Sequence, residues 1–181
     1  MMLYPPFEKK IKLVFIDIDA AKLPLFPFSN SRSFDDQAKI YARGRTTPGE
    51  PCSHDGKSLA VGKCTVHPLG AAVTNSAPGM SMHNYGLAMD FVLKINGRWS
   101  WDYSHPAWAK YGEIVKRNGL RWGADWNGNG VKDKNDFDLP HCELKTALTV
   151  RELKAIYDKG GLAAGGLKAV WAELDKSEGK A

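Results

Sequence analysis

A histidine and a carboxylate stand seven positions apart in residues 81–90, which read Ser-Met-His-Asn-Tyr-Gly-Leu-Ala-Met-Asp. His83 and Asp90 offer an imidazole nitrogen and a carboxylate oxygen, two ligand types that zinc accepts together. Gly86 allows a tight turn between them, and Asp90 is expected on a strand that continues through the apolar residues 91–93. The alternative is a loop histidine followed by a strand with one exposed aspartate. A catalytic zinc site needs a third protein ligand, so the rest of the chain has to supply it.

A second motif, at residues 138–144, reads Asp-Leu-Pro-His-Cys-Glu-Leu. Pro140 interrupts regular structure, and the residues after it fit a short strand on which His141 and Glu143 share one face. Cys142 then points to the other face, where a small buried residue is the simplest interpretation.

Asp138 lies three positions before His141, across a turn. Its carboxylate can therefore lie near a metal without being a ligand, as a general base requires. The sequence predicts a zinc ion held by His83, Asp90 and His141, with Asp138 facing the water that the zinc binds.

These two motifs together resemble the zinc D-Ala-D-Ala carboxypeptidase and L-alanyl-D-glutamate endopeptidase family of cell-wall peptidases, particularly its small phage endolysins. The family pattern is Ser-x-His-x-x-Gly-x-Ala-x-Asp followed by Asp/Glu-x-x-His, and residues 81–90 and 138–141 match it. An upstream arginine before a Gln-containing helix also belongs to the pattern, and Arg32 with Gln37 fits it. The chain departs from the family at residues 30–31, which are Asn-Ser instead of Gly and an aromatic residue, and at Cys142, where Phe is frequent.

The resemblance implies a fold like that of the hedgehog and D-Ala-D-Ala peptidase proteins. We expect a single α+β domain over residues 1–181, with a small antiparallel sheet, flanking helices and a C-terminal helical extension at 150–181. It also implies zinc-dependent hydrolysis of a peptide bond in the peptidoglycan stem. Arg32 would stabilise the charge of the tetrahedral intermediate or hold a substrate carboxylate. Ser81 would brace the His83 turn and line the substrate site.

Three functions remain open at this stage. The favoured one is a phage-type endolysin, an L-alanyl-D-glutamate endopeptidase that causes cell lysis. A D-Ala-D-Ala carboxypeptidase is the first alternative. An alternative of another class is a non-catalytic zinc-binding module that recognises the cell wall.

A third segment, residues 125–136, has the spacing of an EF-hand calcium loop. Oxygen-bearing side chains occupy loop positions 1, 3, 5, 9 and 12, a glycine stands at position 6, and position 7 could give its carbonyl; the candidate ligands are Asp125, Asn127, Asn129, Val131, Asp133 and Asp136. Position 12 carries Asp where Glu is usual. The alternative is an Asn/Gly-rich turn held by side-chain hydrogen bonds. Some endolysins that this chain resembles carry a calcium-responsive loop after a similar Gly-Ala-Asp-Trp-Asn run, so calcium is a second expected cofactor.

The composition is that of an ordinary globular protein of 181 residues, with 43% hydrophobic and 25% charged residues. The net charge of +5 suits an anionic partner such as nucleic acid, a membrane surface or the cell wall. The sequence has no basic cluster interleaved with aromatic residues, so nucleic acid is not the favoured partner. We expect peptidoglycan as the partner and a monomeric protein.

The start of the chain does not have the pattern of a secretory signal. Its apolar run follows Lys9, Lys10 and Lys12 but is interrupted by Asp17 and Asp19. No segment is long enough to be a transmembrane helix. We therefore expect the protein to stay in the host cytoplasm until release and to act on the wall in the periplasm.

Hydrophobic periodicity and turn residues predict the elements around the motifs. Residues 7–18 fit a helix, although their β-branched content also fits a strand. A strand is expected at 23–28, a helix at 34–42 between an Ser33 N-cap and a Gly44 C-cap, and a hairpin of 91–95 with 97–101 around Asn96-Gly97. Another helix should begin with a Ser104 cap and end at Asn118. Two short helices are expected within 150–174, broken by the glycine pairs at 160–161 and 165–166.

Residues 46–79 are rich in Gly, Pro, Ser and Thr and predict a long irregular loop, which in compact domains is usually functional or disordered. The loop contains Cys52, His54, Cys64 and His67. A second zinc site, a disulfide between Cys52 and Cys64, and free thiols are all compatible with this pattern.

Overall fold

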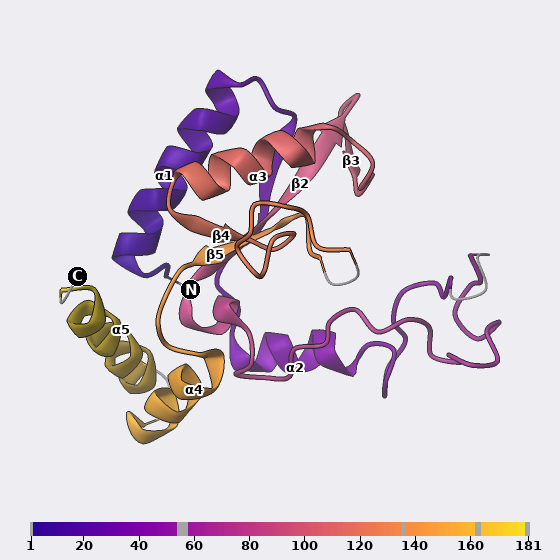
Figure 1. The fold of residues 1–181 in the computed structure, drawn as a ribbon. Coiled ribbons are helices and arrows are strands. Elements are labelled where there is room, and N and C mark those ends of the chain that lie inside the picture. Colours follow the sequence, from indigo (N-terminus) through magenta and orange to yellow (C-terminus); the bar gives the residue numbers. More distant parts are fainter. Residues whose placement is uncertain (1, 54–57, 135–136, 162–163, 180–181) are drawn as a thin grey trace.

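The structure, a computed structural model, describes residues 2–53, 58–134, 137–161 and 164–179. Figure 1 shows the elements in chain order: α1 (Pro5–Ala20), β1 (Leu25–Ser29), α2 (Phe34–Ala42), the 3-10 helix η1 (Met82–Tyr85), β2 (Ala88–Ile95), β3 (Arg98–Ser100), α3 (Ala107–Arg117), β4 (Leu120–Trp122), β5 (His141–Leu144), α4 (Val150–Lys159) and α5 (Ala164–Glu178). The expected α+β architecture with a small antiparallel sheet is confirmed.

Strand β2 is the centre of the sheet, which has the order β1-β2-β5-β4, with β3 also paired to β2. Strand β1 pairs along one edge of β2. The other edge is shared, because β5 pairs with residues 88–90 and β3 with residues 93–95. The hairpin around Asn96 and Gly97 is confirmed, and both residues have the positive φ angles, 49° and 77°, that such a two-residue turn requires.

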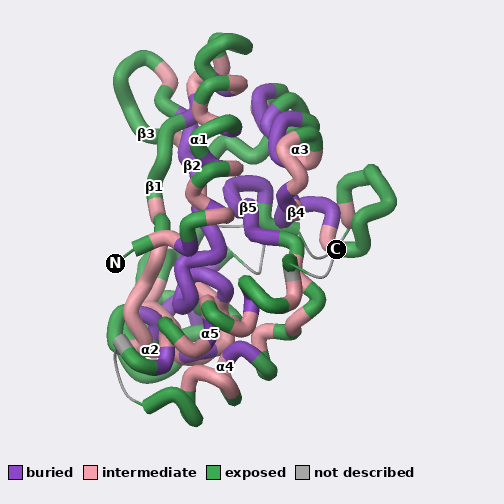
Figure 2. The backbone as a smooth tube through the Cα atoms, turned by 90° about the vertical axis from the view of Figure 1, so that its left-hand side faces the viewer, coloured by how far each residue is buried: buried purple, intermediate pink, exposed green. Residues whose placement is uncertain are grey.

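Helices α1 and α3 cover one face of this sheet (Figure 1). Phe91 of β2 packs there between Phe15 of α1 and Tyr111 of α3, with ring centroids 5.5 and 5.0 Å away. Because side chains alternate along a strand, Asp90 points to the opposite face. Figure 2 shows that buried residues gather in β2, β4 and β5 and on the helix sides that face them.

Helices α4 and α5 pack on each other and join the same buried cluster through Leu153, Val170 and Leu174. The indole of Trp171 donates a 2.8 Å hydrogen bond to the carbonyl of Tyr85 in η1. The second predicted break is wrong, because Gly165 and Gly166 lie inside α5. These glycines allow close packing: a Cβ on Gly166 would stand 2.6 Å from the carbonyl oxygen of Tyr157 in α4.

Two other expectations about element ends need correction, and one strand was missed. Helix α3 begins after Pro106, and the hydroxyl of Ser104, the expected cap, instead donates to Asp102. Helix α2 has the predicted Ser33 N-cap, but its C-cap is Arg43, with Gly44 following at φ 77°. Strand β4 was not predicted, since three residues are too few for a periodic signal.

The long segment between α2 and η1 forms no α-helix or extended strand in its described part. Isolated bridges join Glu50 to Ala71 and Cys52 to Leu59. In Figure 1 the segment leaves the end of α2, extends away from the sheet and returns to η1. The predicted irregular loop is thus observed, and its two ends lie beside the candidate site.

Candidate metal centre and its cleft

Three side-chain atoms from η1, β2 and β5 converge on one point. Nε2 of His83 lies 3.2 Å from Oδ1 of Asp90 and 3.3 Å from Nδ1 of His141. The third distance, from His141 Nδ1 to Asp90 Oδ1, is 3.0 Å. Ligands of a tetrahedral zinc ion at its usual bond lengths are about 3.3 Å apart. The spacing and the donor set, two imidazoles and a carboxylate, therefore fit zinc.

The outer nitrogens of both rings are also engaged. Nδ1 of His83 lies 2.6 Å from the carbonyl oxygen of Asn30, and only a protonated nitrogen can donate to it, so Nε2 is left to bind a metal. Nε2 of His141 lies 3.1 Å from Oε2 of Glu143, whose other oxygen accepts from Arg121 at 3.0 Å. Partners of this kind fix the tautomer and orientation of metal-binding histidines.

In the metal-free protein these carboxylates hold His141 in its protonated form. Burial opposes the charge, but hydrogen bonds to Asp90 and Glu143 outweigh it and raise the pKa of His141 to about 10. Burial would also raise the pKa of Asp90, yet the two histidines hold it far below its ordinary value. A metal that takes Nδ1 of His141 must therefore displace a proton.

Strand pairing explains why two of these groups meet. Asp90 and His141 are direct partners in the β2–β5 ladder, and directly opposed residues point to the same face. His83 reaches them because η1 ends at Gly86, whose φ is 71°. A Cβ on Gly86 would stand 2.6 Å from the carbonyl oxygen of Met2, so the close approach of the N-terminal backbone also leaves no room for a side chain at this position.

Asp138 lines the same cleft as His83, Asp90 and His141. Its side chain is exposed to the cleft. The surrounding protein nevertheless removes part of its water and raises its pKa, and the charge of Asp90 adds to this while His141 opposes it. The 138–141 turn lies against Gly123, where a Cβ would stand 2.5 Å from the Asp138 carbonyl oxygen and 2.9 Å from the His141 Cβ.

Arg32 lies on the other carboxylate oxygen of Asp90, with Nη2 3.8 Å from Oδ2. Its guanidinium donates to Gln37 at 2.9 Å and to Ser29 at 3.1 Å, and its backbone N–H donates to the His83 carbonyl. Gln37 is fully buried, and its amide accepts from Arg32 and donates to the Ser76 carbonyl, so the glutamine of the following helix holds the arginine in place. Arg32 is thus tied to the centre and also lines the cleft.

Ser81 lines the cleft as well, but it does not brace the turn through its hydroxyl. Its backbone carbonyl accepts the N–H of Asn84 instead. The cleft measures about 1060 Å³ and includes three exposed aromatic side chains, Phe28, Trp101 and Tyr103. Sequence reasoning missed these aromatics, because neither their spacing nor their neighbours distinguish them from a strand surface. Exposed apolar groups of this kind are typical of binding sites.

The described part of the predicted calcium loop, residues 125–134, lies beside the centre and is held by its own side chains. Asn127 and Asn129 accept backbone N–H groups two positions on, and Asp133 accepts the N–H of Trp126 at 2.7 Å. Oδ2 of Asp125 accepts from Gly130, and the Lys116 ammonium lies 3.3 Å from it. Its Oδ1 is buried and has no hydrogen-bond partner among the described residues. Asp136, the last expected calcium ligand, lies outside the described residues.

Comparison with known proteins agrees with the motifs. Residues 74–144 match the family model described as D-alanyl-D-alanine carboxypeptidase. Over 121 residues the chain is 33% identical to the peptidoglycan L-alanyl-D-glutamate endopeptidase CwlK of Bacillus subtilis (strain 168), covering 62% of this chain and 56% of that protein. Over 77 residues it is 36% identical to the L-alanyl-D-glutamate peptidase of Escherichia phage T5, covering 37% of this chain and 56% of that protein.

The chain thus spans little more than half the length of each of these relatives. A crystal structure of the L-Ala D-Glu endopeptidase ChiX of Serratia marcescens is similar over 79% of this chain and 80% of its own, with a TM-score of 0.45 and 20% identity. The resemblance to this peptidase family that two short motifs predicted is confirmed.

Proposed function

We propose that this chain, which carries the D-alanyl-D-alanine carboxypeptidase family pattern at residues 74–144, is a zinc-dependent endopeptidase of the peptidoglycan stem. The favoured bond is the one between L-alanine and D-glutamate, since the similar proteins of Bacillus subtilis and phage T5 are named for it. The observation that carries the proposal is the convergence of three ligand atoms, 3.0–3.3 Å apart, in a cleft that also contains Asp138.

His83, Asp90 and His141 would hold the zinc ion. With three protein ligands, this donor set would leave room for the water that a catalytic zinc site needs. Bound zinc supplies a Lewis acid that activates water and polarises the scissile carbonyl. Asn30 and Glu143 keep the two rings oriented for this role through the outer nitrogens.

Asp138 acts as the proton carrier. Its carboxylate takes a proton from the attacking water and later gives it to the nitrogen of the leaving amine. Its place in the cleft, beside the three candidate ligands but not among them, suits this double role.

Arg32 provides fixed positive charge at the cleft. Because Ser29 and Gln37 hold the guanidinium, it does not have to reorganise when negative charge develops on the carbonyl oxygen of the substrate. The same group could hold a carboxylate of the stem peptide. Ser81 and the aromatic side chains of the cleft would contact the substrate around it.

Digestion of purified peptidoglycan, followed by mass spectrometry of the products, tests the proposal. Endopeptidase action should free peptides that begin with D-glutamate and leave L-alanine on the glycan. Release of terminal D-alanine alone would assign the chain to the carboxypeptidase alternative. Wall binding without any released peptide would favour the non-catalytic module.

Calcium remains a second proposed cofactor. The buried Oδ1 of Asp125, which has no hydrogen-bond partner among the described residues, supports it. The side chains of Asn127 and Asp133 are also hydrogen-bonded to each other, and Asn127 accepts the N–H of Asn129, so these candidate ligands lie within one turn. Calcium would have to compete with the Lys116 ammonium at Asp125. Since Trp122 precedes the loop and Trp126 lies within it, a calcium titration followed by tryptophan fluorescence tests the site. A flat response up to millimolar calcium would count against it.

We also propose that the protein works as a monomer, released from the cytoplasm to reach the wall. Among the described residues, no helix combines the length and the apolar character that crossing a bilayer requires. Co-expression with and without a pore-forming protein tests the release, since lysis should depend on the pore. Lysis without it would contradict this part of the proposal.

A further inference from the structure

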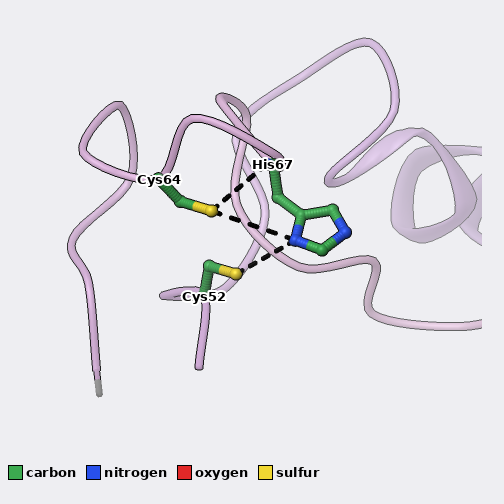
Figure 3. A group of neighbouring side chains, drawn as sticks. All are labelled: Cys52, Cys64 and His67. Atoms are coloured by element: carbon green, nitrogen blue, oxygen red, sulfur yellow. Dashed lines mark hydrogen bonds between the residues drawn. The ribbon is translucent and has the colours of Figure 1, made fainter. Parts of the chain in front are cut away.

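A second group of metal-binding side chains lies in the long segment between α2 and η1. Both thiols of Cys52 and Cys64 point toward the ring of His67, as Figure 3 shows. Nδ1 of His67 lies 3.1 Å from Sγ of Cys52 and 4.0 Å from Sγ of Cys64. Within this group all three potential ligand atoms are within 4.8 Å of one another.

We propose that Cys52, Cys64 and His67 bind a structural zinc ion that clamps this segment. Sulfur and nitrogen ligands of a tetrahedral zinc ion stand about 3.6 Å apart, and the two observed distances lie on either side of that value. Two thiolates and one neutral imidazole also balance the charge of the cation, and they are the soft ligands that select zinc over calcium or magnesium.

Backbone hydrogen bonds hold Cys52, Cys64 and His67 in place around the proposed zinc site. The N–H of His67 donates to Sγ of Cys64 at 3.2 Å, and a donor aimed at sulfur stabilises the thiolate that metals require. The carbonyl of His67 accepts from Gly70 at 2.9 Å, which closes the turn. Cys52 is fixed by two backbone hydrogen bonds to Leu59, of 3.0 and 2.8 Å.

Burial in this segment concentrates on the two thiols. Between residues 44 and 78, Cys52 and Cys64 are the only buried residues with a side chain among those the structure describes. Neither belongs to the main hydrophobic cluster, whereas Val61, Val66 and Val73 are exposed. A segment without its own apolar core needs another source of stability, and a structural zinc ion supplies folding free energy directly.

A disulfide is the competing arrangement. The thiols of Cys52 and Cys64 are not bonded to each other in this structure. A Cys52–Cys64 disulfide would also give the His67 ring no role, although the ring lies against both sulfur atoms. His54, which the sequence places two positions after Cys52, lies outside the described residues, so the proposal uses three protein ligands and leaves the fourth position to another group.

The clamp would act on one wall of the cleft. Glu50, Val73 and Ser76, which flank the cluster in the chain, all line that cleft. The bridge from Glu50 to Ala71 joins the two arms of the segment next to the clamp, and Ser76 accepts a 2.7 Å hydrogen bond from Gln37. Zinc at the cluster would therefore fix the cleft wall without taking part in hydrolysis.

The zinc content of the 181-residue chain, purified from zinc-supplemented medium, gives the first test. The Cys52→Ser/Cys64→Ser double variant should lose one zinc equivalent per chain relative to the unchanged protein. Cys142→Ala is the matched control, because Cys142 is buried in the main core and should not affect the count. His83→Ala should remove the other equivalent, so failure of the proposed catalytic site is distinguishable from failure of the clamp.

Cobalt substitution gives a second test that needs no enzymatic activity. A thiolate bound to cobalt(II) has an intense near-ultraviolet charge-transfer band, and the His83, Asp90 and His141 group contains no sulfur. The band should appear in the unchanged protein and in Cys142→Ala, weaken in His67→Ala, which keeps both thiolates, and vanish in the double variant. An unchanged zinc count in the double variant, the absence of the band, or a mass two hydrogens short of the reduced chain would overturn the proposal.

Discussion

At the scale of single residues, His141 shows how the structure fixes the ring of a candidate metal ligand. One ring nitrogen faces Asp90 in the candidate centre, and the other faces Glu143 on the same strand. The Glu143 carboxylate is buried and paired with Arg121, so it is held in place before any metal binds. A carboxylate behind a histidine raises the basicity of the ligand and fixes the ring.

Replacing Glu143 by Gln should therefore weaken zinc binding about 10–100-fold, because the amide supplies less negative charge to the ring. Competition with a zinc chelator measures the change. Glu113→Gln is the matched control, since Glu113 pairs with Lys110 on the exposed face of α3. Equal zinc affinity in both variants would remove Glu143 from the site.

Asp138 carries a different prediction, because it lines the cleft without belonging to the three ligands. Asp138→Asn should reduce hydrolysis of peptidoglycan about 10²–10⁴-fold, the usual contribution of a general base. Zinc content should stay unchanged. The measurement is the rate of wall clearing together with metal analysis, and full activity in this variant would refute the assigned proton transfer.

Element packing matters as much as side-chain chemistry in this site. The 138–141 turn approaches the end of β4 so closely that only glycine fits at position 123. The backbone N–H of Asp138 donates to the Gly123 carbonyl, and the N–H of Gly123 donates to the His141 carbonyl. Asp138, the proposed base, and His141, the proposed third ligand, are thus positioned by the same residue, Gly123.

Gly123→Ala should destabilise the protein by about 1–3 kcal/mol through overpacking and should also weaken zinc binding. The added methyl group meets backbone and a Cβ, which cannot move aside as a long side chain can. Gly97→Asn is the control, because that position has a positive φ but open space around it. Thermal unfolding and zinc titration of both variants test this, and a neutral Gly123→Ala would contradict the described packing.

The whole molecule depends on one buried cluster that runs from α1 to α5. Tyr4 near the N-terminus donates to Asp175 of α5, and Trp171 ties α5 to η1. We therefore propose that the C-terminal extension at 150–181 is an integral part of the single domain. It packs behind the turn that carries His83.

Leu174→Ala should cost about 2–5 kcal/mol of unfolding free energy, the range for deleting a fully buried leucine side chain. Ile16→Ala, at a position 63% exposed on α1, should change stability by no more than about 0.5 kcal/mol. Denaturant unfolding compares the two. Equal effects would show that α5 does not contribute to the common core.

The sequence by itself predicted the candidate ligands, a candidate base and most elements. Local spacing predicts the hairpin turn at Asn96 and the Ser33 cap, because each depends on residues a few positions apart. The same holds for the ligand types and the candidate base. The resemblance extended this to a family and a reaction. Element ends were less certain, as at Ser104 and Gly165, because packing against neighbours decides where a helix begins.

The sequence predicted that His83, Asp90 and His141 share one zinc ion, but only the tertiary structure showed the backbone contacts that bring them together. The register of β2 with β5 places Asp90 opposite His141, 51 positions away, and no local pattern encodes such a pairing. Three other features also come from the tertiary structure alone. They are the contact of the Asn30 carbonyl with His83, the aromatic side chains that line the cleft, and the position of His67 between two thiols. Each depends on how the backbone closes in space, which sequence spacing alone does not specify.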